Sequence, residues 1–332
     1  MAYSTINKPS DYFNTKLYSG TNTPQSITGV GFQPDWTWIK VRNVADNHFI
    51  YDSVRGATKF VHSDLSNAEG TLANGLTSFN SDGFSLGDSG STNNASNTFA
   101  SWNWKANGTA SSNTDGSITS SVSANTTSGF SIVSYTGTGS SSTTGHGLNS
   151  APEIMFSKSR TAVQNWSVHT TIIDGSFDYL VLNDTNAKAD SGFTAPTSTV
   201  IPTRVGSDYI SYNFHSVKGF SKFGTYTGNA DADGPFIYTG FKPSFVMIKK
   251  YSGTGHWMMM DNARNTFNEI GERLKANATD AGADASYQDH LSNGFKIRTN
   301  ADSWNGSGAN YIYMAFAEAP LVGTNNIPAT AR

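Results

Sequence analysis

The sequence predicts an all-β protein built from three tandem β-sandwich or jelly-roll modules, with one short helix in the third module. Three observations carry this prediction. The composition is rich in strand-forming and turn-forming residues, four sequence blocks recur three times in one order, and large side chains alternate with small ones inside a block. Short strands at regular spacing, bounded by turn residues, are typical of sandwiches and jelly rolls.

The composition favours short strands joined by many turns. The 332 residues include 20 Phe, 14 Tyr, 7 Trp and 32 Gly, and only 14% are charged. Aromatic residues favour strands, whereas glycine permits turn conformations. The length suits two or three domains of about 100–200 residues each.

Charge and cysteine content exclude several classes of function. The 22 basic and 25 acidic residues give a formal net charge of -3, without a Lys/Arg cluster that would grip a phosphate backbone. No apolar run approaches the roughly 18 residues that span a bilayer. The absence of cysteine excludes disulfides, thiolate metal sites and a cysteine nucleophile. We therefore expect no nucleic-acid partner and no membrane insertion.

Four blocks recur in the same order along the chain. Each copy opens on Tyr-x-Gly, continues to a proline that is followed six positions later by a lysine, and then has an aromatic residue eight or nine positions after that lysine. In copy order these residues are Tyr18, Tyr135 and Tyr226, then Pro34, Pro152 and Pro243, then Lys40, Lys158 and Lys249, then Phe49, Trp166 and Trp257. An ordered repetition of this kind indicates a repeated structural unit.

The fourth block closes each copy with three large residues at one spacing. They are Phe99, Trp102 and Trp104 in the first copy, Tyr209, Tyr212 and Phe214 in the second, and Tyr311, Met314 and Phe316 in the third. A period of two predicts a strand buried on one face. The proline-to-lysine block is more continuously apolar, which predicts a central strand. We expect each module to enclose its own aromatic core.

Two shorter similarities also link the copies. An Asp-x-x-Arg motif occurs at residues 52–55 and 261–264, and a glycine-bounded turn followed by a strand is predicted at residues 81–87 and 292–297. The middle copy keeps only Gly192-Phe193 of the second pattern.

A single stretch has helical spacing. From residue 265 to residue 277, Phe267, Ile270 and Leu274 fall on one face of a helix. This spacing predicts the one short helix of the third module.

The blocks divide the chain into six segments. These are an N-terminal arm (1–14), module 1 (15–106), a linker rich in Ser, Thr, Gly and Asn (107–128), module 2 (129–217), module 3 (218–320) and a C-terminal tail (321–332). Ile118 and Val122 leave room for a strand within the linker. Modules 2 and 3 are nearly contiguous, so we expect them to pack rigidly together.

Several segments resemble a family of repeat-containing virion structural proteins of tailed bacteriophages, especially marine ones. The matching segments are TINK (5–8), DYFN (11–14), GFQPDWTWIK (31–40), DSVRGA (52–57), GFSKF (219–223), GFKP (240–243) and NIPATAR (326–332). The likeness runs along nearly the whole chain. Members of this family look like tail fibre, appendage or particle-surface components with lectin-like sandwich modules.

The resemblance implies a non-enzymatic structural protein that is made in the host cytoplasm and displayed on the virion, most simply as a tail fibre or appendage component. A capsid decoration or head-fibre protein is the alternative within this class. A carbohydrate-binding adhesin, with a host-surface glycan as its ligand, is an alternative of another class. The expected partners are other virion proteins, contacted through residues 1–14, and further copies of the chain in a homo-oligomer, taken to be a trimer.

The sequence shows no catalytic constellation. A phosphate-binding loop, a nucleophile elbow and a His-Glu-x-x-His motif are all missing. His48 and His256 precede matching aromatic residues in two copies, which favours structural roles over catalysis. Glycosidase action would need two facing carboxylates, and no pair stands out. We therefore predict no enzymatic activity, no catalytic residues and no cofactor.

Residues 229–234 (NADADG) resemble the start of a calcium loop. Such a loop ends in a bidentate Glu at its twelfth position, and counted from Asp231 that position is Lys242. A plain Asp/Gly turn is the better interpretation, and no metal site is predicted. The repeated aromatic residues have rings that can stack on sugars, but their alternation favours a core role, so binding residues stay unassigned.

Overall fold

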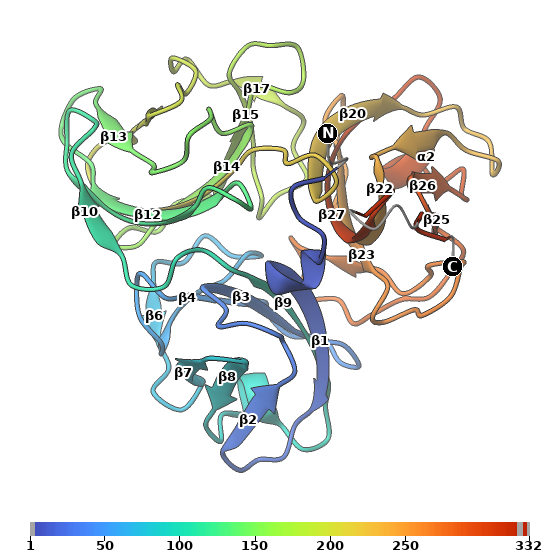
Figure 1. Ribbon diagram of the computed structural model, residues 1–332, viewed down its shortest axis with the longest axis horizontal. Helices are drawn as coiled ribbons and strands as arrows, with labels where there is room; N and C mark the ends of the chain where they lie inside the picture. Colours follow the sequence, from blue (N-terminus) through green and yellow to red (C-terminus); the bar gives the residue numbers. More distant parts are fainter. Residues whose placement is uncertain (1–3, 324–327, 331–332) are drawn as a thin grey trace.

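Three β-sheet lobes surround a common centre (Figure 1). This computed structural model describes residues 4–323 and 328–330. Each lobe combines one large antiparallel sheet with one smaller sheet. The predicted all-β architecture is confirmed. No helix in the described ranges is long and apolar enough to cross a membrane.

The first lobe holds strands β1 to β9 and lies at the bottom of Figure 1. Its large sheet contains, in spatial order, β1 (Phe13–Ser19), β9 (Thr98–Trp104), β3 (Trp36–Val41), β4 (Phe49–Asp52), β5 (Lys59–Val61) and β6 (Gly70–Thr71). Its small sheet contains β2 (Gln25–Thr28), β8 (Gly83–Leu86) and β7 (Leu76–Asn80). A 3-10 turn, η1 (Pro9–Asp11), precedes β1, and a four-residue helix, α1 (Gly90–Asn93), precedes β9.

The second lobe holds strands β10 to β19. Its large sheet contains β10 (Ser111–Asn113), β11 (Ser120–Asn125), β12 (Phe130–Thr136), β19 (Asp208–Phe214), β14 (Ile154–Ser159), β15 (Ser167–Thr170), β16 (Asp178–Leu180) and β17 (Ala189–Asp190). Its small sheet has only β13 (Thr143–Gly145) and β18 (Val200–Pro202).

The third lobe holds strands β20 to β27. Its large sheet contains β20 (Ser221–Thr227), β27 (Asn310–Pro320), β22 (Phe241–Lys250), β23 (Trp257–Asp261) and β24 (Leu274–Lys275). Its small sheet contains β21 (Phe236–Tyr238), β26 (Gly294–Ile297) and β25 (Gln288–Leu291). A four-residue helix, α2 (Asp302–Asn305), precedes β27.

The same strand order recurs in the three large sheets. The strand that carries the Tyr-x-Gly tyrosine pairs with the last strand of its lobe, and the proline-to-lysine strand pairs with that last strand on its other side. The resulting orders are β1-β9-β3-β4, β12-β19-β14-β15 and β20-β27-β22-β23. The proline-to-lysine strands are buried along nearly their whole length, as predicted for central strands. The register also makes residues of different lobes equivalent: Trp38 pairs with Trp102, Phe156 with Tyr212, and Met247 with Met314.

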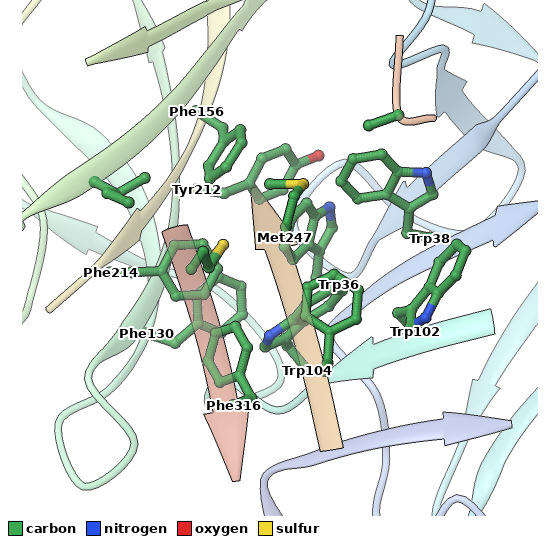
Figure 2. Close-up of a cluster of buried hydrophobic side chains, with 14 of the residues drawn as sticks. Trp36, Trp38, Trp102, Trp104, Phe130, Phe156, Tyr212, Phe214, Met247 and Phe316 are labelled. Atoms are coloured by element: carbon green, nitrogen blue, oxygen red, sulfur yellow. The ribbon is translucent and has the colours of Figure 1, made fainter. Parts of the chain in front are cut away.

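The last two large residues of each closing block lie in a cluster at the centre of the molecule (Figure 2), whereas the first ones, Phe99, Tyr209 and Tyr311, lie in the lobes' own clusters. The rings of Trp104, Phe214 and Phe316 form a triangle with centroid separations of 6.5, 5.9 and 5.7 Å. Every pair is edge to face, at 64–72°, which is a favoured geometry for aromatic pairs. Around this triangle, Trp36 stacks on Tyr212 at 4.5 Å and Phe13 stacks on Phe316 at 5.0 Å.

The expectation that each module encloses its own aromatic core is wrong for these side chains. The central cluster draws on all three large sheets, whereas separate clusters lie between the large and small sheets of each lobe. The closing strands are therefore buried on both faces, not on one. Small residues of these strands, Asn103, Asn213 and Ala315, face the lobes' own cores, and both asparagines are hydrogen-bonded there.

The predicted helix at residues 265–277 is also wrong. Phe267 is 76% exposed, so the apolar stripe that suggested a helix does not face a core. Leu274 lies on β24 opposite Met259, and Ile270 forms an isolated bridge to Gln288. The side chain of Asn265 accepts hydrogen bonds from the backbone N–H groups of residues 271 and 272, which holds an irregular loop instead. The short helix of the third lobe is α2.

The segments outside the predicted modules are built into the lobes. Residues 107–128 carry β10 and β11, which extend the second large sheet. In the N-terminal arm, Ile6 is buried in the central cluster and Ser4 donates a hydrogen bond to Lys218 O at 3.1 Å. The arm is therefore packed from residue 4 onward and does not project. Residues 1–3 and most of the NIPATAR segment lie outside the described residues.

A fully buried lysine in each lobe binds the neighbouring lobe. Each Nζ donates to a backbone carbonyl across the interface; the pairs are Lys40 with Thr279 (3.2 Å), Lys158 with Ser66 (3.1 Å) and Lys249 with Thr185 (3.0 Å). The first lobe thus contacts the third, the third contacts the second and the second contacts the first. The three interfaces close into a ring.

A second ring of hydrogen bonds follows the same direction. It is made by the residue eight positions after each lysine, and its pairs are His48 Nε2 with Lys275 O (2.9 Å), Trp166 Nε1 with His62 O (2.7 Å) and Trp257 Nε1 with Val181 O (2.9 Å). His48, and not Phe49, is therefore the equivalent of the two tryptophans. Trp38 Nε1 donates to His48 Nδ1 at 2.8 Å, so Nε2 carries the proton. Burial holds the pKa of His48 well below its ordinary value.

The Asp-x-x-Arg motifs are buried ion pairs at two of the three interfaces. Asp52 and Arg55 bind each other and are fully buried, and Tyr212 of the second lobe donates to Asp52 at 2.7 Å. Asp261 and Arg264 repeat this pair at 2.6 Å in the third lobe, where the donor at 2.9 Å is the indole of Trp102.

The third interface replaces every member of this arrangement. The second lobe has Thr170 and Ile173 at the places of the Asp and the Arg. In the third lobe, Met314 stands at the place of Tyr212 and Trp102. A buried carboxylate, its counter-charge and its donor are thus present together or missing together, as the cost of burying an unpaired charge requires.

Removing one member of the first-lobe pair tests this account. Arg55→Met leaves Asp52 buried without its counter-charge, and we expect the free energy of unfolding to fall by about 3–5 kcal/mol in chemical denaturation. The matched control copies the third interface with Asp52→Thr, Arg55→Ile and Tyr212→Met together. This triple variant recovers most of the loss, and a triple variant no more stable than Arg55→Met contradicts the account.

The buried lysines predict a pH dependence of stability. Burial lowers the pKa of Lys40, Lys158 and Lys249 from 10.5 to about 8. Between these values the unfolded chain binds more protons than the folded chain, so the free energy of unfolding rises with pH from about 8 toward 10. Above about pH 10, buried tyrosines whose pKa is raised oppose this rise.

Denaturation curves between about pH 7.5 and 10 measure this effect. Lys158→Met makes the rise smaller because one of the three lysines no longer titrates. Lys59→Met, on β5 and not in the ring, leaves the slope unchanged. A slope that Lys158→Met does not alter would show that the lysine titrates alike in the folded and unfolded chains.

Candidate functional site

The second lobe differs from the others in the core between its two sheets. The first and third lobes each have one continuous cluster there, whereas the second has two small clusters. Part of the reason lies on the large sheet, where Ser157 takes the place of Ile39 and Ile248. A polar side chain at that position gives a covering sheet less apolar surface to bury.

The small sheet of the second lobe is also reduced. In the other lobes the hairpins β7–β8 and β25–β26 cover the large sheet. The second lobe keeps only Gly192-Phe193 of this pattern, and these residues form no strand. A hollow of about 550 Å³ opens instead, lined by Gln164, Asn165, Trp166, Ser167, His169, Tyr179, Val181, Ser191, Phe193, Arg204, Val205 and Tyr209.

His169 lies in the wall of this hollow with an unused polar atom. It sits on β15 opposite Tyr179 of β16, and its equivalents in the other lobes, Tyr51 and Met260, are covered by their small sheets. The side chain is only 3% exposed, yet its Nδ1 has no hydrogen-bond partner among the described residues. Its ring stacks on Phe177 at 5.2 Å. Burial, followed by the charge of Arg204, lowers its pKa to about 3, so the imidazole is neutral.

Arg204 brings the positive charge of the site. Its Nη1 donates to Ser167 Oγ at 2.5 Å, and its guanidinium carbon lies 6.0 Å from the ring centre of Tyr209. The described lining residues include no Asp or Glu. The guanidinium therefore meets no opposite charge in the wall of the hollow, which makes it suitable for an anionic group.

The remaining wall is aromatic and apolar. Tyr179 and Phe193 are half-buried, with ring centres 6.0 and 5.8 Å from that of His169. Val205 is 49% exposed, at the rim. An apolar wall with a few polar groups that point into it is the usual composition of a small-ligand site.

The residues considered for metal binding form a turn. Asn229 Oδ1 accepts a hydrogen bond from the backbone N–H of Asp231, and Asp231 Oδ1 accepts one from the backbone N–H of Asp233. The Asp233 side chain forms an ion pair with Lys296 at 2.9 Å. Within the described ranges, no group of three or more His, Asp or Glu side chains is placed to hold a metal ion. His256 is half-buried and lies 3.3 Å from Asn277 Oδ1, at the start of β23.

The hollow was not predicted from the sequence. One signal was available, because the middle copy lacks the glycine-bounded strand that the other two copies share. Arg204 and His169 carry no motif, and both line the hollow because Arg204, in the segment after β18, reaches Ser167 on β15.

Residues 8–320 match a protein family described as Domain of unknown function (DUF7483). The chain belongs to this family. The match begins next to η1 and ends at the last residue of β27, so it takes in all three lobes. No curated protein and no solved structure matches the chain.

The unpartnered histidine gives a test of the site by stability. His169→Met introduces the residue of the third lobe and removes a buried nitrogen without a partner, so we expect the free energy of unfolding to rise by about 1 kcal/mol. The control is His146→Met, because His146 is equally buried but uses both ring nitrogens, toward Thr197 O and the N–H of Leu148. That variant is destabilised. Destabilisation of both variants to the same extent would show that His169 is an ordinary core residue.

Proposed function

We propose that this chain is a non-enzymatic structural protein displayed on a bacteriophage particle, as a tail fibre or appendage component. The family resemblance of its segments supports the proposal. The structural observation that supports it most is the central aromatic cluster, to which all three lobes contribute.

A shared core suits a protein that is exposed on a particle. Relative motion of the lobes would break the Trp104, Phe214 and Phe316 triangle and expose large aromatic surfaces, so the lobes act as one body. The chain contains no cysteine, and its stability outside a cell would have to come from such burial. The rings of lysine and indole hydrogen bonds add directional contacts between the same lobes.

A capsid decoration or head-fibre protein is the alternative within the same class. Attachment to other virion proteins through residues 1–14 and assembly into a homotrimer stay predictions. The packing of residues 4–14 means that such an attachment would use the outer surface of this segment, where Lys8 and Asp11 form an exposed ion pair at 2.6 Å.

Detection of the chain in purified particles tests the proposal. We expect peptides from all three lobes in the virion proteome and antibody labelling at one location on intact particles. A copy number of about a dozen or fewer indicates the tail, and tens to hundreds indicate the capsid, since tails and shells repeat their subunits in these ranges. Absence of the chain from washed, infectious particles contradicts a virion role.

A further inference from the structure

We propose that the hollow of the second lobe binds one carboxylated sugar unit, such as a hexuronic acid. The inference goes beyond the structural role and does not depend on it, because the wall of the hollow is the same wherever the chain is displayed. It rests on the cation, the free imidazole nitrogen and the aromatic wall, which converge on one cavity in one lobe.

The cation determines the anionic part of the ligand. Arg204 is half-buried, and its hydrogen bond to Ser167 holds the guanidinium in place before a ligand arrives. A planar guanidinium with free N–H groups matches a carboxylate in geometry as well as in charge. Since none of the described residues that line the hollow is acidic, the ligand does not compete with a carboxylate among them.

The free nitrogen indicates hydroxyl groups next to that anion. His169 Nδ1 is buried and unpartnered, and the imidazole is neutral, so the nitrogen donates in one tautomer and accepts in the other. A hydroxyl group satisfies either tautomer because it both donates and accepts. Binding a polyhydroxylated ligand therefore removes the cost of a buried polar atom without a partner.

The aromatic wall and the volume indicate a sugar ring. Tyr179 and Phe193 flank His169, and their half-buried rings can cover the C–H groups of a pyranose. A volume of about 550 Å³ lies within the usual range for small-ligand pockets and accommodates one or two sugar units.

The other two lobes act as an internal comparison. Where the second lobe has His169 and a hollow, the first has Tyr51 under Leu76, and the third has Met260 in a cluster with Phe295. The fold therefore does not require a hollow at this position. The second lobe has a hollow lined by His169 and Arg204 where the other two lobes have a packed apolar cluster.

Titration of the full chain with sodium glucuronate, with glucose as the neutral control, tests the proposal by isothermal calorimetry or by NMR. We expect saturable glucuronate binding and binding of glucose that is weaker by about tenfold or more, because a hydrogen bond to a charged partner is worth roughly that factor. Arg204→Gln loses about tenfold in glucuronate affinity, and Arg204→Lys retains part of it.

A matched pair of valines separates this hollow from other surfaces. Val205→Trp places a large side chain at the rim and abolishes binding, whereas Val163→Trp, at a residue 72% exposed that does not line the hollow, leaves it unchanged. Cooperative thermal unfolding of both variants verifies that they fold. Equal affinity for the two sugars, binding that persists in Val205→Trp, or no saturation by glucuronate would each overturn the proposal.

Discussion

The contact on which the rest of the structure depends is the meeting of Trp104, Phe214 and Phe316 at the centre. Each ring lies on the closing strand of a different lobe, and each touches the other two edge to face. No lobe alone covers this face of its large sheet, so the hydrophobic effect that would stabilise an isolated sandwich here stabilises the union of three. The lobes are sequence repeats, but they share one hydrophobic core and stabilise one another.

Around this apolar centre, the polar contacts between lobes follow the same threefold arrangement. Each lysine ammonium donates to a backbone carbonyl of the neighbouring lobe. The residue eight positions after the lysine donates to a second carbonyl of that lobe, through an imidazole in the first lobe and an indole in the others. The buried Asp–Arg pairs follow a stricter rule: they occur only where the facing residue can donate a hydrogen bond to the carboxylate. Buried charge is tolerated because its partners are fixed by the surrounding core.

The symmetry leaves each lobe's outer side free to differ. The central cluster and the rings of hydrogen bonds stabilise all three lobes. The second lobe can therefore have a reduced small sheet, a divided core between its sheets and a polar cavity and still be held in the assembly. Repeat architectures can keep the interfaces between neighbouring units alike while one unit carries a surface of its own for binding. The hollow borders the contacts between lobes, because Trp166 and Val181 line it and also take part in the second ring of hydrogen bonds.

The sequence by itself determined the all-β architecture and the equivalence of most residues in the repeated blocks, because alternation, turn residues and repetition are local signals. It did not determine the order of the strands within the sheets. It did not determine which core the closing aromatics enter. Alternation shows which residues share a face of a strand, but it does not show which other elements pack against that face. The helix predicted at residues 265–277 does not form, because the Asn265 side chain accepts hydrogen bonds from the backbone of residues 271 and 272 and because Leu274 pairs with β23. Only the tertiary structure shows that His169 and Arg204, 35 positions apart, line one hollow. A hollow in a close-packed protein depends on which side chains pack against that part of the sheet, and these come from segments far apart in the sequence.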